Sequence, residues 1–141
     1  MKDLNNTLEE ITNITNWWYN LGKGYNSISH LDDVHRKLTG LYFFLSELTA
    51  QYYKDYSMSY VSKKVGLSKQ KAAIMESKKT AALADAKSIL AMADVIRKEA
   101  EEEAIYNRCK LMLNATAKII EAVKQKISNL KAEKSNSNNQ V

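Results

Sequence analysis

The residue types that most often carry out enzymatic chemistry are scarce in this chain. Its 141 residues include two histidines, His30 and His35, and one cysteine, Cys109. The histidines do not share a helical face as an i, i+4 metal-binding pair would, and one cysteine completes neither a zinc cluster nor an internal disulfide. Glycine-rich phosphate loops, G-x-S-x-G turns and H-E-x-x-H motifs are also missing from the sequence. We therefore predict that the protein is not an enzyme and needs no metal or cofactor.

One segment has a composition that suits ligand binding. Residues 54–79 contain seven Lys or Arg against two Asp or Glu, an excess equal to the net charge of +5 of the whole chain. Lysines neutralise phosphates and tyrosine rings stack on unpaired bases, so the segment is a candidate site for single-stranded nucleic acid. An acidic protein partner and ordinary helix packing are the alternatives. The candidate residues are Tyr52, Tyr53, Tyr56, Tyr60, Lys63, Lys64, Lys69 and Lys71.

The composition and periodicity indicate an all-α fold. The chain has no proline and four glycines, which argues against a fold with many tight turns. Apolar residues three or four positions apart predict a short helix over about 3–21 and a second over about 31–64. Between them, Gly22 is predicted to be a left-handed cap, and Ser29 with Asp32 resembles a capping box. The second helix has a heptad pattern typical of a coiled-coil or bundle seam at Leu31, Val34, Leu38, Leu41, Leu45, Leu48 and Tyr52.

The rest of the chain predicts one very long C-terminal helix. Residues 68–133 contain no proline or glycine and consist mainly of strong helix formers. Gly66 leaves two interpretations open, because it can close the second helix in a hairpin or lie within a continuous helix at a cost of about 1 kcal/mol. We favour the hairpin. Residues 1–133 would then form a single helical domain, and the polar residues 134–141 a disordered tail.

An apolar stripe on the distal half of this long helix predicts self-association. In a hairpin closed at Gly66 the third helix is roughly twice as long as the second, so its distal half would overhang. An exposed apolar stripe is an association surface, and we expect a coiled-coil-like homo-oligomer. The candidate interface residues are Ile105, Met112, Ile119, Val123, Ile127 and Leu130. The acidic run between Glu99 and Ala104 is expected to be solvated or to contact the basic segment of another copy.

A resemblance accompanies these patterns. The run LTGLYFFLSELTAQYYKDYSMSYVSKKVGLSKQKAAIMESKKTAALADAKSIL resembles the short helical proteins that tailed bacteriophages encode in their early replication and recombination regions. Those proteins share a leucine heptad, then a Tyr/Lys-rich segment, then an Ala/Glu/Lys helix ending in a polar tail. The resemblance implies an accessory role in phage DNA metabolism or in countering the host, and it implies no catalytic residues.

Three functional hypotheses follow from the sequence. The leading one is a non-enzymatic, self-associating helical scaffold or adaptor, and the alternative is a protein that binds single-stranded DNA in phage replication or recombination. The third is an inhibitor of a host defence protein. The N-terminus is polar and acidic, and no stretch approaches the length of a membrane span. We therefore expect a soluble cytoplasmic protein, located in the host cytoplasm if a phage encodes it.

Overall fold

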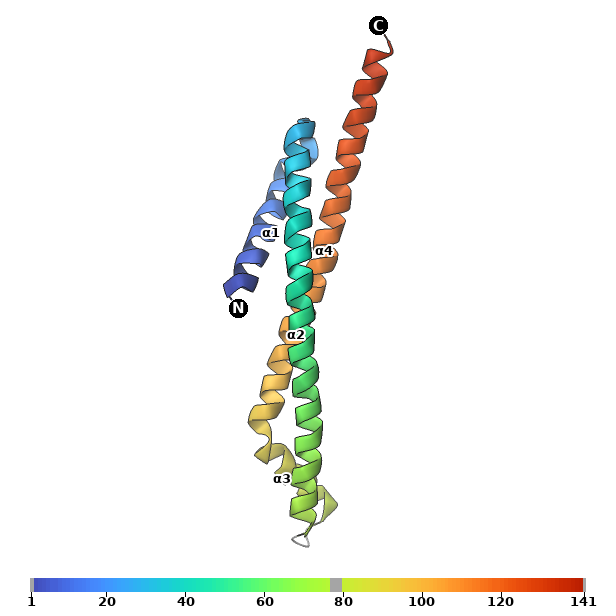
Figure 1. Cartoon of the computed structure of the whole chain (residues 1–141). Coiled ribbons are helices and arrows are strands. Elements are labelled where there is room, and N and C mark those ends of the chain that lie inside the picture. The colour runs from blue at the N-terminus through green and yellow to red at the C-terminus, as the bar shows by residue number, and fades with distance from the viewer. Residues whose placement is uncertain (1, 77–79, 141) are drawn as a thin grey trace. The chain divides into compact units, whose positions relative to one another are not determined.

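A computed structural model describes residues 2–76 and 80–140, and every regular element in these residues is a helix (Figure 1). The elements are α1 (Lys2–Asn20), the 3-10 helix η1 (Gly22–Gly24), α2 (Ile28–Glu76), α3 (Ala81–Ala91) and α4 (Ala93–Asn138). This confirms the predicted all-α class with a long C-terminal helix. The contacts divide the chain into two compact units: unit 1 (Met1–Leu48 and Cys109–Val141) and unit 2 (Thr49–Arg108). The single domain over residues 1–133 stays a prediction.

Unit 1 packs α1 against the first part of α2 and the last part of α4. The heptad positions predicted for α2 form its buried face, since Leu31, Leu38 and Leu45 have no exposed surface. From α1, Trp18 enters the core while Trp17 packs at its edge, because adjacent residues on a helix point about 100° apart. One buried cluster joins the three helices and consists of Trp18, Leu31, Leu38, Ile119, Val123, Ile127 and Leu130.

The apolar stripe of α4 is therefore covered by its own chain. Ile119, Val123, Ile127 and Leu130 are buried, and Ile105 and Met112 are half-buried. The prediction of an interface between copies is wrong for these four buried residues, and for Ile105 and Met112 it stays a prediction. The physical reason is the length of α2. Because α2 continues well past Gly66, its first turns lie beside the distal part of α4, where the hairpin predicted an overhang, and α1 covers the remaining side.

Gly66 lies inside α2, so the favoured hairpin turn at this position is wrong and the continuous-helix interpretation is right. A Cβ atom at Gly66 would lie 3.1 Å from Met92 Sδ and would collide with Met92 Cε. The glycine thus leaves room for the side chain of Met92, which lies at the junction of α3 and α4. Its cost of about 1 kcal/mol is small for a helix that packs along its length against other helices.

The helix predicted for residues 68–133 starts later and is interrupted once. Residues 68–76 belong to α2, and α3 begins after Thr80, whose Oγ1 accepts a hydrogen bond from Leu83 N–H at 3.3 Å. Met92 separates α3 from α4 with φ −103° and ψ 13°. Within α3, the buried hydroxyl of Ser88 donates to Ala84 O at 2.7 Å. Such back-bonding competes with the helix ladder and favours a bend, which the sequence composition did not reveal.

The last turns of α4 include residues that we expected to be disordered. The helix continues to Asn138, and the hydroxyl of Ser137 donates to Glu133 O at 3.0 Å. Extending an existing helix adds one hydrogen bond for each residue that is fixed, so polar residues continue a helix that they would not start.

The connection between α1 and α2 depends on a buried glycine. Gly22 was predicted to adopt a left-handed conformation, but its φ lies outside that region. Its small size matters instead, because a Cβ atom would lie 2.7 Å from Trp17 Cζ3 and 2.8 Å from Trp18 Cε3. The capping box predicted at Ser29 is also wrong, since α2 begins at Ile28 and the Oγ of Ser27 accepts the N–H of His30 at 3.3 Å.

We expect Gly22→Ala to destabilise the protein by about 1–3 kcal/mol, because the added methyl group displaces two indole rings next to the core of unit 1. Equilibrium unfolding in urea, followed by tryptophan fluorescence and circular dichroism, measures the loss. Gly24→Ala is the matched control, because a Cβ atom there meets nothing within 4 Å. Equal midpoints for the Gly22→Ala variant and the parent would contradict this packing.

Candidate interaction surface

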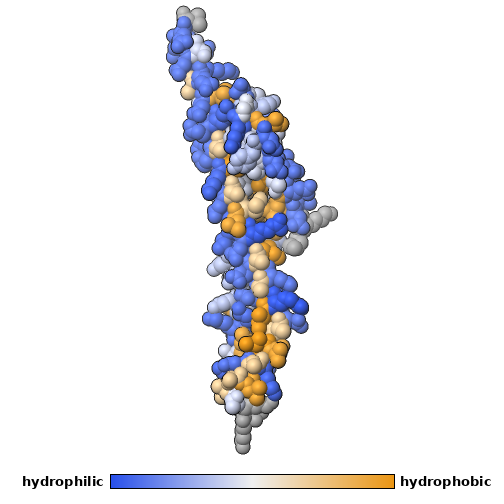
Figure 2. All heavy atoms as spheres, turned by 180° about the vertical axis from the view of Figure 1, so that it is seen from behind, coloured by the Kyte–Doolittle hydropathy of each residue, from blue (hydrophilic) through white to orange (hydrophobic). Residues whose placement is uncertain are grey.

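A row of apolar and small side chains lies exposed on α2 in unit 2. Their spacing of three and four residues is that of heptad positions a and d. Met58, Val61, Val65 and Met75 expose 61%, 58%, 46% and 43% of their surface. Figure 2 shows hydrophobic side chains gathered at the surface of the part of the chain that includes α3. We call the row the α2 seam, and its residues are Met58, Val61, Val65, Ser68, Ala72 and Met75.

From Met58 to Val65, the α2 seam lies on the side of α2 opposite its packed face, and at Ser68 it borders α3. Tyr56, Ser59 and Lys63 are half-buried, and helical periodicity puts them on the side of α2 opposite the seam. Ile89 of α3 lines a surface hollow together with Ser68, so α3 adds apolar surface at the edge of the seam. The spacing of these residues is visible in the sequence, but spacing does not show whether another helix covers them.

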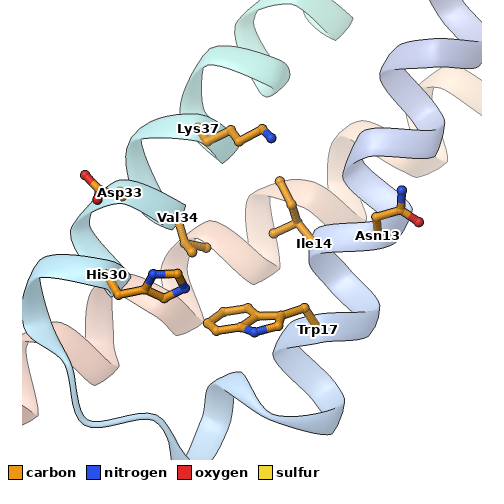
Figure 3. A pocket seen from close by; sticks show the side chains of 7 residues that line it. All are labelled: Asn13, Ile14, Trp17, His30, Asp33, Val34 and Lys37. Atoms are coloured by element: carbon orange, nitrogen blue, oxygen red, sulfur yellow. The ribbon is translucent and has the colours of Figure 1, made fainter.

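Unit 1 contains a groove of about 420 Å³ between α1 and α2. Ile14, Trp17 and Val34 form its apolar lining, and His30 packs against Trp17 with ring centroids 5.3 Å apart. Figure 3 shows these side chains converging on the groove and Lys37 reaching from α2 toward α1. An apolar side chain or a small ring fits such a lining. The remaining lining residues are Asn13 and Asp33.

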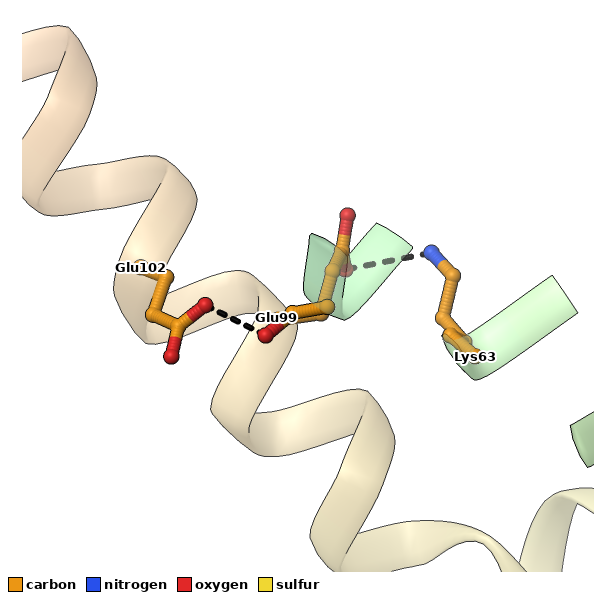
Figure 4. Close-up of polar contacts among 4 residues, drawn as sticks. Lys63, Glu99 and Glu102 are labelled. Carbon is orange, nitrogen blue, oxygen red and sulfur yellow. Dashed lines mark hydrogen bonds and ion pairs between the residues drawn. The ribbon is translucent and has the colours of Figure 1, made fainter. Parts of the chain in front are cut away.

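The acidic run of α4 contacts the basic segment of its own chain. Lys63 Nζ lies 3.1 Å from Glu99 Oε2, and the Lys63 and Glu99 side chains are only 22% and 7% exposed. One turn further along α4, Glu102 accepts a hydrogen bond from the Ser59 hydroxyl. Figure 4 shows Lys63 reaching from α2 to Glu99. The expectation that these acidic residues are solvated or meet another copy is therefore wrong for Glu99 and Glu102.

The tyrosines of the candidate nucleic-acid site pack mainly against a tyrosine of α4. Tyr106 lies 5.1 Å from Tyr53 and 6.0 Å from Tyr56 between ring centroids, and the second pair is stacked at 11°. Burial, and then the negative charges of Glu103 and Glu99, raise the pKa of Tyr56. Tyr52 is half-buried, whereas Tyr53 and Tyr60 expose 53% and 37% of their surface.

The candidate lysines are divided between two environments. Lys63 is paired with Glu99, and Lys71 Nζ lies 2.9 Å from Asp85 Oδ1. Lys64 and Lys69 are exposed. The Lys64 ammonium lies 5.0 Å from the centroid of the Tyr60 ring, and hydrogen bonding to Tyr60 raises the pKa of Lys64. Two of the four candidate lysines are thus paired with carboxylates of the same chain.

Lysines flank the α2 seam on both sides. In the heptad frame of the seam, Lys64 and Lys71 occupy g positions and Lys69 an e position. Side chains at e and g border the helix partner in a coiled coil and decide which charges it tolerates. Glu76 occupies the next e position beside Met75, and Lys71 is paired with Asp85, so the border is most positive around Val65 and Ser68, where Lys64 and Lys69 lie.

Among residues 2–76 and 80–140, no group of three or more His, Cys, Asp or Glu side chains is placed to hold a metal ion. No helix of this part of the chain is long and apolar enough to cross a membrane. Cys109 is buried.

The fold and the seam together define the class, an all-α protein with an exposed, lysine-bordered apolar row on a long helix. Comparisons of the chain with protein-family models, with curated proteins and with solved structures found no match. The resemblance to phage accessory proteins therefore stays a prediction, and the functional proposals depend on the geometry alone.

Proposed function

We propose that the protein is a non-enzymatic helical adaptor that binds another protein through the α2 seam. The exposure of four large apolar residues in a/d register, Met58, Val61, Val65 and Met75, carries the proposal. A surface helix normally turns a polar face to water, and a row of apolar side chains gains free energy when a second helix covers it. A partner helix laid along α2 would bury the whole row by knobs-into-holes packing.

The proposal keeps the adaptor role of the leading hypothesis but assigns the binding to a different surface of the protein. The stripe on α4 is occupied by α1 and α2, so the reason for predicting self-association through that stripe is gone. The α2 seam replaces it as the binding surface. Binding of single-stranded nucleic acid stays a prediction, and it would have to use the exposed Tyr53, Tyr60, Lys64 and Lys69.

A synthetic helix tests the seam directly. The probe is a fluorescent three-heptad peptide with Leu and Ile at a and d and uncharged Gln at e and g, used at concentrations at which it is monomeric. We expect the full chain to raise its anisotropy with micromolar affinity, because an interface this short is small for a protein complex. The double variant Val61→Asp, Val65→Asp should weaken binding at least about tenfold, because two buried methyl-bearing side chains become charges.

The control for this experiment is Phe43→Asp. Phe43 lies on the same helix in unit 1, is 68% exposed and is not part of the seam. Circular dichroism should show unchanged helix content in both variants, because all three positions are exposed. If the peptide does not bind the parent chain, or binds the Val61→Asp, Val65→Asp variant equally well, the seam is not a helix-binding surface and the proposed function is wrong.

A further inference from the structure

The charge border of the α2 seam identifies the class of partner. Lys64 and Lys69 lie on opposite sides of the seam and are both exposed. Lys71 adds a third positive charge, shared with Asp85 at 2.9 Å. We infer that the seam binds an acidic amphipathic helix, with large apolar residues at a and d and Asp or Glu at e and g. This inference rests on the proposed function and specifies the partner chemistry.

A second copy of the chain is a poor partner for the same surface. In a parallel pair of α2 helices, the g position Lys64 would meet the e position Lys69 of the second copy, and the reverse contact repeats the repulsion. In an antiparallel pair, g positions meet g positions, so Lys64 and Lys71 would face each other. Like charges across an interface oppose association, whereas carboxylates at the same positions attract both lysines.

The middle of the seam indicates the shape of the partner. Ser68 and Ala72 are small and exposed, and they separate the larger Val65 from Met75. Small side chains let a second helix approach closely, so the partner should place bulky Leu or Ile residues opposite them.

An anionic membrane surface would also attract lysines, but helices that lie on membranes carry bulky Trp, Phe or Leu on the apolar face. The Val, Ser, Ala and Met residues of the seam suit a helix better.

The preference of the seam for acidic or basic partners can be measured with three peptides that differ only at heptad positions e and g. They carry Glu, Gln or Lys at these positions on the same Leu/Ile core, and anisotropy titrations with the full chain give their affinities. We expect the Glu peptide to bind at least about tenfold more tightly than the Lys peptide, with the Gln peptide between them. In 1 M salt, where the Debye length is about 3 Å, most of this difference should disappear.

Reversing the charge of the two exposed lysines that border the seam should invert the order of the peptide affinities. The variant Lys64→Glu, Lys69→Glu should lose roughly tenfold in affinity for the Glu peptide and gain affinity for the Lys peptide. The matched control is Lys124→Glu, Lys131→Glu, which changes the net charge equally at exposed sites of α4 in unit 1. That control should leave the order of the three peptides unchanged.

The outcomes separate the two proposals. If the three peptides bind equally and Val61→Asp, Val65→Asp abolishes binding, the seam binds helices but the acidic partner is wrong. If the Glu peptide binds through the lysines and ignores the seam variant, the attraction is only electrostatic and both proposals fail. Vesicles of phosphatidylcholine and phosphatidylserine test the membrane alternative. Binding to these vesicles without binding to the Glu peptide would overturn the inference in favour of a membrane surface.

Discussion

Replacing Ile119 by Asp is expected to unfold unit 1. Ile119 is 4% exposed and belongs to the cluster that joins α1, α2 and α4. The substitution removes a buried aliphatic side chain and places a carboxylate where water cannot reach it. We expect a loss of about 4 kcal/mol or more in the free energy of unfolding. A small domain is stable by about 5–15 kcal/mol, so a loss of this size removes a large share of the stability, and the variant should melt far below the parent or be unfolded at 37 °C.

Two measurements distinguish this result from the dissociation of an oligomer. Circular dichroism and thermal unfolding report the loss of helix, and light scattering reports the mass of the parent and the variant. The matched control is Leu111→Asp, since Leu111 lies on the same helix and is 70% exposed. It should change stability by no more than about 0.5 kcal/mol. A folded Ile119→Asp variant with half the mass of the parent would show that the stripe joins two copies after all.

Removing the Lys63 side chain should have the second largest effect. Glu99 is 7% exposed on its side chain, and Lys63 is its ion-pair partner at 3.1 Å. Lys63→Ala leaves a buried carboxylate without its countercharge, which typically costs about 3 kcal/mol. Glu99→Ala should cost less, because the longer and more exposed lysine can turn its ammonium toward water. Urea denaturation of both single variants tests this asymmetry.

The double variant Lys63→Ala, Glu99→Ala completes a double-mutant cycle for this ion pair. It should be more stable than Lys63→Ala alone, because the unpaired buried charge is gone. Lys37→Ala provides a comparison at an exposed pair, where Lys37 lies 3.8 Å from Glu10 and the side chains are 61% and 52% exposed. Its effect should stay below about 1 kcal/mol. If Lys63→Ala and Lys37→Ala cost the same, the contact between Lys63 and Glu99 contributes no more than a surface pair.

The sequence predicted the helical elements better than the place where the chain reverses. The heptad from Leu31 to Tyr52 predicted which face of α2 is buried, because helical periodicity depends only on the order of polar and apolar residues. Gly66 misled the prediction because a glycine that ends a helix and one that makes room for a neighbour look identical in sequence. Only the proximity of Met92 distinguishes them.

The candidate site was predicted in part. Composition singled out the Tyr/Lys segment, but the pairing of its lysines with Glu99 and Asp85 depends on which helix lies alongside. The apolar seam from Met58 to Met75 was present in the same segment and was overlooked, because periodicity shows that a face is apolar and does not show whether anything covers it.

Composition and periodicity by themselves determined the all-α class and the long C-terminal helix, because helix propensity and side-chain spacing are local properties of the chain. The tertiary structure decided which apolar faces meet. It buried the stripe from Ile119 to Leu130 and left the stripe from Met58 to Met75 exposed. Both stripes step by three or four residues, so spacing alone does not tell the covered stripe from the exposed one. The length of α2 decides which residues lie opposite each other once the chain turns back.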